Sequence, residues 1–361
     1  MSSTHRAVAV VGAGLAGLVA ATEAIEAGAD VLLLERDREP RGATADSAGW
    51  IWRYQDLRLA RACAPGGDPA VQHAVVEGLD DDLAWLERRG ARLEATSTGR
   101  AFTCGARVDA RRTQAVLLDA IERARPDALR TDTTVESATR LADGRIELRT
   151  RRGSGASLGD EPIEVVVVDH VVFAGGGFAR DFERIARHAG ASSAAREWWV
   201  LRAPNAGDGS SMDAAVELGG QLVPAGGECL VRLVPSAGPG DDAVPGREQL
   251  VRAGELQADG HVLVDADGRE IERSPHDWSG AQAAWALARR SGHGRIELPA
   301  QVLGVRLHAG GTVRDVVHAA IADGAQGGRL QGGGAWLAVR AGLTTTRGTL
   351  RVDGAGRVLA P

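Results

Sequence analysis

Two short apolar segments near the N-terminus flank a segment with helical spacing. Residues 7–11 (AVAVV) and 30–35 (DVLLLE) are apolar at successive positions, which is typical of strands buried on both faces. Residues 15–27 between them predict a helix that ends at Gly28, because glycine enters the left-handed conformation freely. Buried strands joined through a helix indicate a parallel sheet, so this pattern predicts an α/β fold.

The pattern continues through the middle of the chain. The segment LDDDLAWLERRG predicts a helix that starts at Asp80–Asp82, buries a stripe of leucines and ends at Gly90. A further helix is predicted over residues 112–124, followed by the strands TVESATRL and GRIELRT with a turn at Asp143–Gly144. We therefore expect helices and paired strands to follow the first βαβ unit.

Residues 163–174 form the most apolar stretch in the middle of the chain, and they predict another core strand that ends in three glycines. The segment NAGDGSSMDAAVELGG then predicts a glycine-rich turn and a helix that stops at Gly219. From about Ala225 the segments become shorter and more mixed, which indicates a domain boundary.

Composition excludes several classes of protein. The 361 residues suffice for about two domains, and a net charge of -6 argues against nucleic acid as a partner. All 42 basic residues counted as Lys+Arg are arginines, so mechanisms that need a lysine ammonium, such as P-loop phosphate binding and Schiff-base catalysis, are excluded. The apolar run at residues 7–21 is too short for a membrane span.

The three cysteines, Cys63, Cys104 and Cys229, lie far apart without a C-x-x-C pair. This spacing predicts neither a zinc site nor a disulfide framework, and no metal is expected. We interpret the cysteines as free thiols and expect a cytoplasmic protein.

A dinucleotide-binding fingerprint joins the first strand to the first helix. Gly12, Gly14 and Gly17 form G-x-G-x-x-G, and Glu35 stands 23 residues after the first glycine, at the end of the second strand. The glycines permit a tight turn, the approach of a pyrophosphate and helix packing, and the carboxylate accepts hydrogen bonds from a ribose. The alternative is a glycine-rich turn without a ligand. Glu35 disfavours NADP, although Arg36 beside it suits a 2′-phosphate, so NAD and FAD remain.

The chain resembles a flavoprotein family in four motifs that occur in the family's order. These are the fingerprint, ERDREPRGATADSAGWIW, HVVFAGGGFARD and NAGDGSSMDAAVELGG. Together they resemble the fumarate reductase and succinate dehydrogenase flavoprotein superfamily, and Gly49-Trp50 and Trp52 are most similar to its 3-ketosteroid dehydrogenase branch. The resemblance implies FAD as the cofactor and a Rossmann-like domain of the glutathione reductase type with an inserted α+β cap domain.

The resemblance also implies a set of cofactor contacts. Thr44 and Ser47 are expected to hydrogen-bond FAD, and Val135 to lie near the adenine through its backbone. The full set of expected cofactor-binding residues is Gly12, Gly14, Ala16, Gly17, Glu35, Arg36, Thr44, Ala45, Ser47, Gly49, Val135, Ala174, Gly175, Gly176, Asp208 and Gly209. Trp50 and Trp52 are expected to lie against a flavin or a flat substrate, with core packing as the alternative.

By resemblance, residues 1–225 form the FAD-binding domain, 226–341 the cap over the substrate, and 342–361 an incomplete return to the first domain. The implied reaction is hydride transfer between flavin N5 and a carbon β to a carbonyl group of a small-molecule substrate. Tyr54 and Arg269 are the candidate catalytic residues, and His276-Asp277 is a further candidate pair. Substrate identity, reaction direction, electron acceptor and oligomeric state stay open.

Two departures from the family affect the expected activity. TTTRGTL, at residues 344–350, replaces a histidine that precedes a glycine pair in fumarate reductases, which disfavours dicarboxylate chemistry and favours a neutral, flatter substrate. The sequence ends at VDGAGRVLAP, where the family continues with a flavin-contacting strand, turn and helix. We therefore keep an alternative: an FAD-binding protein without turnover, truncated or completed by a partner. An NAD-dependent dehydrogenase is disfavoured because the common Tyr-x-x-x-Lys pair needs a lysine.

Overall fold

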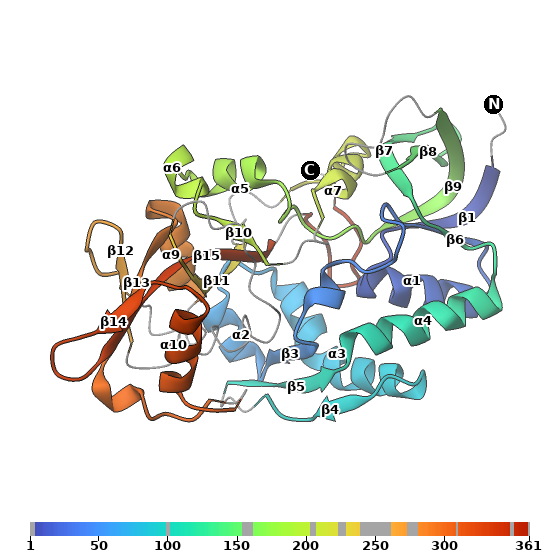
Figure 1. Cartoon of the computed structure of the whole chain (residues 1–361). Coiled ribbons are helices and arrows are strands. Elements are labelled where there is room, and N and C mark those ends of the chain that lie inside the picture. The colour runs from blue at the N-terminus through green and yellow to red at the C-terminus, as the bar shows by residue number, and fades with distance from the viewer. Residues whose placement is uncertain are drawn as a thin grey trace. The chain divides into compact units, whose positions relative to one another are not determined.

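A computed structural model describes most of the chain in two compact units (Figure 1). The first unit comprises residues 1–178, 205–226 and 348–361, and the second comprises residues 179–204 and 227–347. The second unit thus includes residues 179–204 and extends to residue 347, which differs from the boundaries expected at 225 and 341. The described residues are 4–98, 102–153, 162–202, 207–222, 229–238, 261–272, 281–307, 310–346 and 350–359.

The first unit has a mixed sheet of strands, helices on its faces and a smaller antiparallel sheet. In chain order its elements are β1 (Thr4–Val11), α1 (Leu15–Glu26), β2 (Val31–Leu34), the 3-10 turn η1 (Ala43–Asp46), β3 (Trp50–Tyr54), α2 (Leu57–Cys63), α3 (Pro69–Arg88), β4 (Leu93–Ala95), β5 (Thr103–Val108), α4 (Ala110–Ala124), β6 (Leu129–Arg130), β7 (Thr133–Arg140), β8 (Ile146–Arg152), β9 (Ile163–Phe173) and α7 (Ser210–Glu217).

The main sheet has the strand order β6-β2-β1-β9-β8-β7 among the described residues. Strands β6, β2, β1 and β9 are parallel, whereas β8 and β7 add on antiparallel. The expected βαβ start, the strand at 163–174 and the turn at Asp143–Gly144 are confirmed.

Both faces of β1 and β2 are covered, which explains their continuous apolar runs. On one face, Val10 and Leu33 pack with Leu18 of α1 and Leu117 of α4. On the other, Ala9, Val11, Leu32 and Leu34 pack with side chains of β7, β8 and α7. Because neither face meets water, alternation of polar and apolar residues is unnecessary in these strands.

Helix α3 corrects one prediction. It begins at Pro69 with Asp68 as N-cap, whose carboxylate accepts from the N–H groups of Ala70 and Val71, so the triplet Asp80–Asp82 lies inside the helix. A proline at the first helical position after an aspartate is a strong start pattern, and it outweighs a later acidic run. The expected stripe of Leu79, Leu83 and Leu86 is buried.

A three-stranded antiparallel sheet, ordered β3-β5-β4, packs on α3. Ile51 of β3 and Ala106 of β5 lie against Leu79 and Leu83. Strand β3, which follows the loop at residues 41–49, therefore packs on helix α3.

The second unit contains a sheet built around one long strand, β15, which pairs with four other strands in the part of the chain that the structure describes. Helix α9 packs against β11, β13 and β15, and the Trp199 indole N–H donates to the Ala288 carbonyl of α9 at 3.1 Å. The elements are α5 (Phe182–Ala189), α6 (Ser193–Arg196), β10 (Val200–Leu201), β11 (Cys229–Pro235), β12 (Val262–Asp265), α9 (Ala281–Arg290), β13 (His293–Leu298), the 3-10 turn η3 (Ala300–Val302), α10 (Val313–Ala322), β14 (Gly327–Arg329) and β15 (Ala335–Thr346).

Candidate functional site

The carboxyl ends of β1, β2 and β9 meet at one edge of the main sheet. The Gly12 N–H donates to the Leu34 carbonyl at 2.7 Å, and the Ala174 N–H donates to the Val11 carbonyl at 2.8 Å. In open α/β sheets, ligands bind at this edge. We call residues 12–17, 35–36, 174–177 and 207–211, which converge here, the cradle.

The cradle is closely packed around glycines. A Cβ added at Gly12, whose φ is +100°, would stand 2.6 Å from the Ala174 carbonyl oxygen, and one at Gly17 would stand 1.8 Å from the Gly12 carbonyl oxygen. A Cβ at Gly175 would stand 2.4 Å from the Ser211 Cβ, at the start of α7. These glycines therefore hold the turn, helix α1 and helix α7 against one another.

Gly14 differs from these glycines because the space beside it is open. A Cβ at Gly14 would meet no atom within 4 Å, and Gly14 caps α1 without any side-chain hydrogen bond. The N–H groups of the first helical turn, which includes Ala16 and Gly17, have no acceptor within the helix and favour an anion. The residues present therefore fit the pyrophosphate of a dinucleotide.

Glu35 is a buried carboxylate that fixes the fingerprint turn. Its Oε2 accepts from the Ala13 N–H at 2.7 Å, and its Oε1 accepts from the Asp37 N–H at 2.9 Å. Burial raises the pKa of Glu35 above its ordinary value, and these two N–H donors offset this only partly. A carboxylate accepts about four hydrogen bonds, so Glu35 retains capacity for ribose hydroxyl groups.

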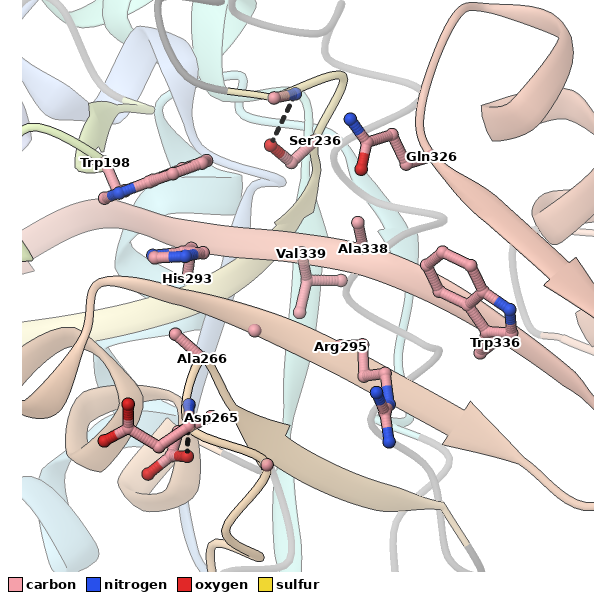
Figure 2. Close-up of a pocket in the computed structure, with 14 residues that line it drawn as sticks. Trp198, Ser236, Asp265, Ala266, His293, Arg295, Gln326, Trp336, Ala338 and Val339 are labelled. Atoms are coloured by element: carbon pink, nitrogen blue, oxygen red, sulfur yellow. Dashed lines mark hydrogen bonds between the residues drawn. The ribbon is translucent and has the colours of Figure 1, made fainter.

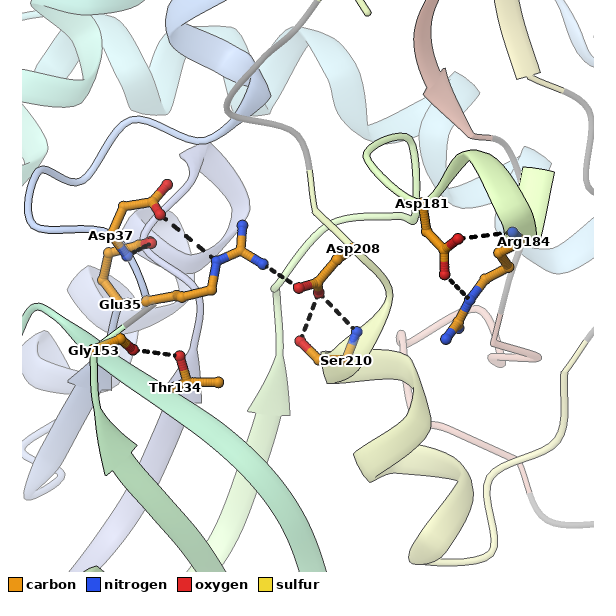
Figure 3. A network of polar contacts seen from close by, with 9 residues as sticks. Glu35, Asp37, Thr134, Gly153, Asp181, Arg184, Asp208 and Ser210 are labelled. Atoms are coloured by element: carbon orange, nitrogen blue, oxygen red, sulfur yellow. Dashed lines mark hydrogen bonds and ion pairs between the residues drawn. The ribbon is translucent and has the colours of Figure 1, made fainter. Parts of the chain in front are cut away.

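Arg36 and Asp208 join two sides of the cradle. The Arg36 Nη1 donates to the Asp208 Oδ2 at 2.6 Å, and Asp208 also accepts from the N–H and the hydroxyl of Ser210 (Figure 3). Burial acts to raise the pKa of Asp208, but the Ser210 N–H and the Arg36 charge outweigh it, so this pKa lies below its ordinary value. Gly209 between Asp208 and Ser210 has a φ of +90° and caps α7.

The loop at residues 41–49 lies over the start of α1. A Cβ at Gly42 would stand 3.1 Å from the Gly14 Cα, and the Leu15 N–H donates to the Thr44 hydroxyl oxygen at 3.4 Å. The Ser47 hydroxyl oxygen accepts from the Gly49 N–H at 3.1 Å. Both hydroxyl groups act as acceptors in these bonds, which leaves their hydrogens for a ligand.

Sequence reasoning missed the residue that holds this loop. Gln114 of α4 is 5% exposed, and its Nε2 donates to the Arg41 carbonyl at 2.6 Å. A polar residue on the apolar face of a predicted helix is the pattern that identifies it. Ala45 within the loop is buried, and the Gly49 carbonyl accepts from the Val108 N–H, which ties the end of the loop to β5.

Val135 and Gly176 complete the expected cofactor set. Val135 is buried in β7, two residues after Thr133, whose N–H donates to the Glu35 carbonyl at 2.9 Å. Gly176 has a φ of +77° and lies in the glycine run after β9. Gly176 is thus part of the cradle, and Val135 follows shortly after a residue that bonds to the cradle backbone at Glu35.

The two tryptophans and the tyrosine share one face of β3. Ile51 points into the core, and because successive side chains of a strand alternate, Trp50, Trp52 and Tyr54 face the other way. Trp52 and Tyr54 meet edge to face at 5.5 Å between centroids, and Trp50 is 38% exposed. Opposite Trp52 stands Gly105, where a Cβ would lie 2.6 Å from the Trp52 Cα.

The other proposed catalytic groups lie in the second unit. The Arg269 side chain is 76% exposed, on the turn after β12, and pairs with Asp267 at 3.4 Å. His276 and Asp277 fall outside the described residues. No His, Cys, Asp and Glu group within the described ranges could hold a metal ion, and Cys63 and Cys104 are free.

The chain matches the model of a known protein family. The family model described as FAD binding domain matches residues 7–345. The chain belongs to this FAD-binding family. FAD as cofactor, the flavoprotein class and the fold expected from the resemblance are thus confirmed. A search of curated proteins found no match.

Solved flavoenzymes share the fold across nearly the whole chain. The chain is similar to the open conformation of a flavocytochrome c3 fumarate reductase, at 18% identity and a TM-score of 0.66 over 99% of this chain and 70% of that one. It is also similar to 3-ketosteroid-delta4-(5alpha)-dehydrogenase from Rhodococcus jostii RHA1, at 19% identity and a TM-score of 0.61 over 99% of this chain and 88% of that one. The similarity to 3-ketosteroid delta1-dehydrogenase from Sterolibacterium denitrificans has 13% identity and a TM-score of 0.68, over 99% of this chain and 91% of that one. Along the described segments, no helix combines the length and apolarity needed to span a bilayer.

Proposed function

We propose that this chain is an FAD-dependent oxidoreductase that forms or reduces the C=C bond next to the carbonyl group of a cyclic ketone. In the oxidative direction the substrate loses a hydride from the carbon β to the carbonyl and a proton from the α carbon. FAD, when bound, supplies the hydride acceptor or donor. The cradle residues Gly14 and Glu35, with Thr44 of the loop at residues 41–49, would hold it through the open space, the carboxylate and the hydroxyl described above.

The observation that carries the proposal is the aromatic face of β3. Trp50 follows directly on the loop whose Gly42 approaches Gly14, so three ring side chains begin where the loop over the cradle ends. Flat aromatic side chains favour a flat, apolar ring system over a dicarboxylate. The two ketosteroid dehydrogenases of the same fold, whose structures hold steroid diones, support this choice of a flat ring substrate.

Tyr54 is the proposed carrier of the proton. It ends the aromatic face, and its edge contact with Trp52 limits rotation of its ring. As a phenolate, a tyrosine so placed can accept the α proton in the oxidative direction, and the resulting phenol can return it in the reductive direction. Arg269 stays the second candidate, because its exposed guanidinium can donate hydrogen bonds to a carbonyl oxygen.

The test in the oxidative direction is turnover of the purified, FAD-loaded chain with 4-androstene-3,17-dione or cyclohexanone and an artificial electron acceptor. In the reductive direction it is reaction of cyclohexenone with the dithionite-reduced protein. Loss or return of the visible flavin absorbance under anaerobic conditions reports the half-reaction directly. We expect Tyr54→Phe to lower turnover by about 100-fold or more with FAD content unchanged. Arg269→Gln is the matched comparison in the second unit, and a larger loss there would assign the role to Arg269.

Two results would contradict the proposal. A yellow protein whose flavin is reduced by dithionite but by no ketone would indicate FAD binding without this turnover. Reduction of fumarate by the dithionite-reduced protein, without reaction of any enone, would replace the cyclic ketone with a dicarboxylate.

A further inference from the structure

A hollow of about 510 Å³ opens in the second unit over β13 and β15. Figure 2 shows Trp198 and His293 at one end and Trp336 with Arg295 at the other, with Ala338 and Val339 between them. The small side chain of Ala338 leaves open space over the strands between the two aromatic ends, and Gly294 also lines the hollow. All of these residues belong to the second unit, and the cofactor cradle contributes none of them.

The hollow uses the face of the sheet opposite α9. Ile296 and Leu337 pair across β13 and β15 and are fully buried, and a Cβ at Gly294 would approach the Leu287 side chain of α9. Strand alternation then places Arg295, Ala338 and Trp336 on the other face. Helix α9 therefore covers the core side and leaves this side for the hollow.

The first aromatic end is rigid. Trp198 and His293 stack at 3.6 Å between centroids with a 16° angle between their planes. The His293 Nδ1 lies 3.0 Å from the Ser291 carbonyl oxygen, and because a carbonyl only accepts, Nδ1 carries the hydrogen. This hydrogen bond fixes the orientation of the imidazole ring.

The second aromatic end is formed by Trp336. A Cβ at Gly328 of β14 would stand 2.8 Å from the Trp336 Nε1, so the indole lies on the backbone of the neighbouring strand. A side chain larger than glycine at this position would displace the ring. The two aromatic ends are therefore fixed by packing before any ligand arrives.

The two carboxylates that line the hollow, Asp265 and Asp267, already have partners in the protein. The Asp265 Oδ1 accepts from the N–H groups of Asp267 and Arg269, and its Oδ2 faces the Arg290 Nη1 at 3.6 Å. Asp267 pairs with Arg269 at 3.4 Å. These carboxylates stabilise their own turn, so they provide little attraction for a cation.

Arg295 is the charged donor with capacity to spare. Its Nε donates to the Glu297 Oε1 at 2.7 Å, while its terminal nitrogens have no acceptor among the residues that the structure describes. Its side chain is 50% exposed and lines the hollow. A guanidinium with two free terminal nitrogens matches a carboxylate in geometry and charge.

We propose that this hollow binds a planar aromatic carboxylate, with the ring against Trp336 and the carboxylate on Arg295. The Ser236 hydroxyl, whose oxygen accepts from the Gly238 N–H, provides one further donor on the opposite wall. An aromatic ring gains from the indole face, and the negative charge gains from the arginine. The proposal is independent of the reaction proposed for the cradle.

The test is titration calorimetry of the FAD-saturated protein with naphthoate. Decalin carboxylate, which lacks the aromatic ring, and naphthylmethanol, which lacks the charge, serve as matched ligands. We expect naphthoate to bind and both counterparts to bind at least about fivefold more weakly. Arg295→Gln should weaken naphthoate binding about tenfold or more, and Trp336→Leu several-fold.

Arg329→Gln on β14 removes an exposed arginine that does not line the hollow, and should leave naphthoate affinity unchanged. FAD content and the thermal midpoint of each variant show whether it is folded. Equal naphthoate affinity in Arg295→Gln and the parent protein would overturn the proposal. So would absence of binding, or equal binding of naphthylmethanol.

Discussion

The guanidinium of Arg36 donates to the carboxylate of Asp208 at 2.6 Å, across 172 residues of sequence. The bond connects Arg36, two residues after β2, to Asp208, two residues before α7. The Arg36 Nε also lies 3.6 Å from the Asp37 Oδ1. Each residue was expected to bind cofactor on its own account. In the structure the two residues bind each other instead. Arg36, which suited a 2′-phosphate, therefore already has Asp208 as its partner.

A double-mutant cycle measures this pairing. Arg36→Gln and Asp208→Asn should each lower the free energy of unfolding by only about 1 kcal/mol, because the Asp208 side chain is 46% exposed and partly screened. The double variant should lose less than the sum, because each single variant already removes the shared ion pair. Denaturant unfolding gives the values. The pair Arg145–Asp143, 2.6 Å apart and exposed, is the control and should couple by less. Additive effects of Arg36 and Asp208 would contradict the prediction.

Gly12 and Gly14 should respond differently to alanine. Gly12→Ala places a Cβ 2.6 Å from the Ala174 carbonyl oxygen at a φ of +100°, so we expect a loss of about 3 kcal/mol in unfolding free energy. Gly14→Ala meets no protein atom and has a φ of -69°, so stability should stay within about 0.5 kcal/mol. Its FAD affinity should nevertheless fall about tenfold or more, since the new methyl group enters the space left for the pyrophosphate.

Gly78→Ala, in the interior of α3, is the control for these two substitutions. The nearest atom to its added Cβ is a side-chain oxygen at 3.7 Å, so we expect a gain of about 0.5–1 kcal/mol and unchanged FAD affinity. Equilibrium FAD titration and denaturant unfolding are measured on the same samples. Unchanged FAD affinity in Gly14→Ala would show that the cofactor does not approach this glycine.

Glu35 should make both stability and FAD binding depend on pH. Burial raises its pKa in the folded protein above the ordinary value of 4.5. Its contribution to stability is therefore complete below the unfolded pKa and is lost as pH rises through the folded pKa. FAD affinity should change in the opposite sense, since only the ionised carboxylate accepts bonds from both ribose hydroxyl groups.

FAD titrations from neutral pH down to the ordinary pKa of a glutamate check this prediction. Affinity should fall as the pH drops through the raised pKa of Glu35. Glu35→Gln should bind FAD about tenfold more weakly at neutral pH and lose this pH dependence. An unchanged pH profile in Glu35→Gln would assign the dependence to another group.

Local sequence predicted much of the first unit because its rules act over short distances. The fingerprint glycines, the apolar runs of β1, β2 and β9, and the end of α1 at Gly28 each follow from steric limits or burial within about thirty residues. The misplaced start of α3 shows the limit of such rules. An acidic triplet and an Asp-Pro pair are both start patterns, and the helix begins at the Asp-Pro pair, where the Asp68 carboxylate caps it.

Tertiary structure decided which distant groups meet. Nothing local to Arg36 indicates Asp208, and nothing in helix α4 alone shows that Gln114 holds the Arg41 carbonyl. Likewise, the stack of Trp198 on His293 depends on how β10 and β13 each pair with β15. Sequence by itself determined the elements and the nucleotide-binding turn, since backbone geometry and the pattern of apolar positions are set by neighbours along the chain. The pairing of charges and rings was set only when the sheets formed, because such contacts depend on positions in space.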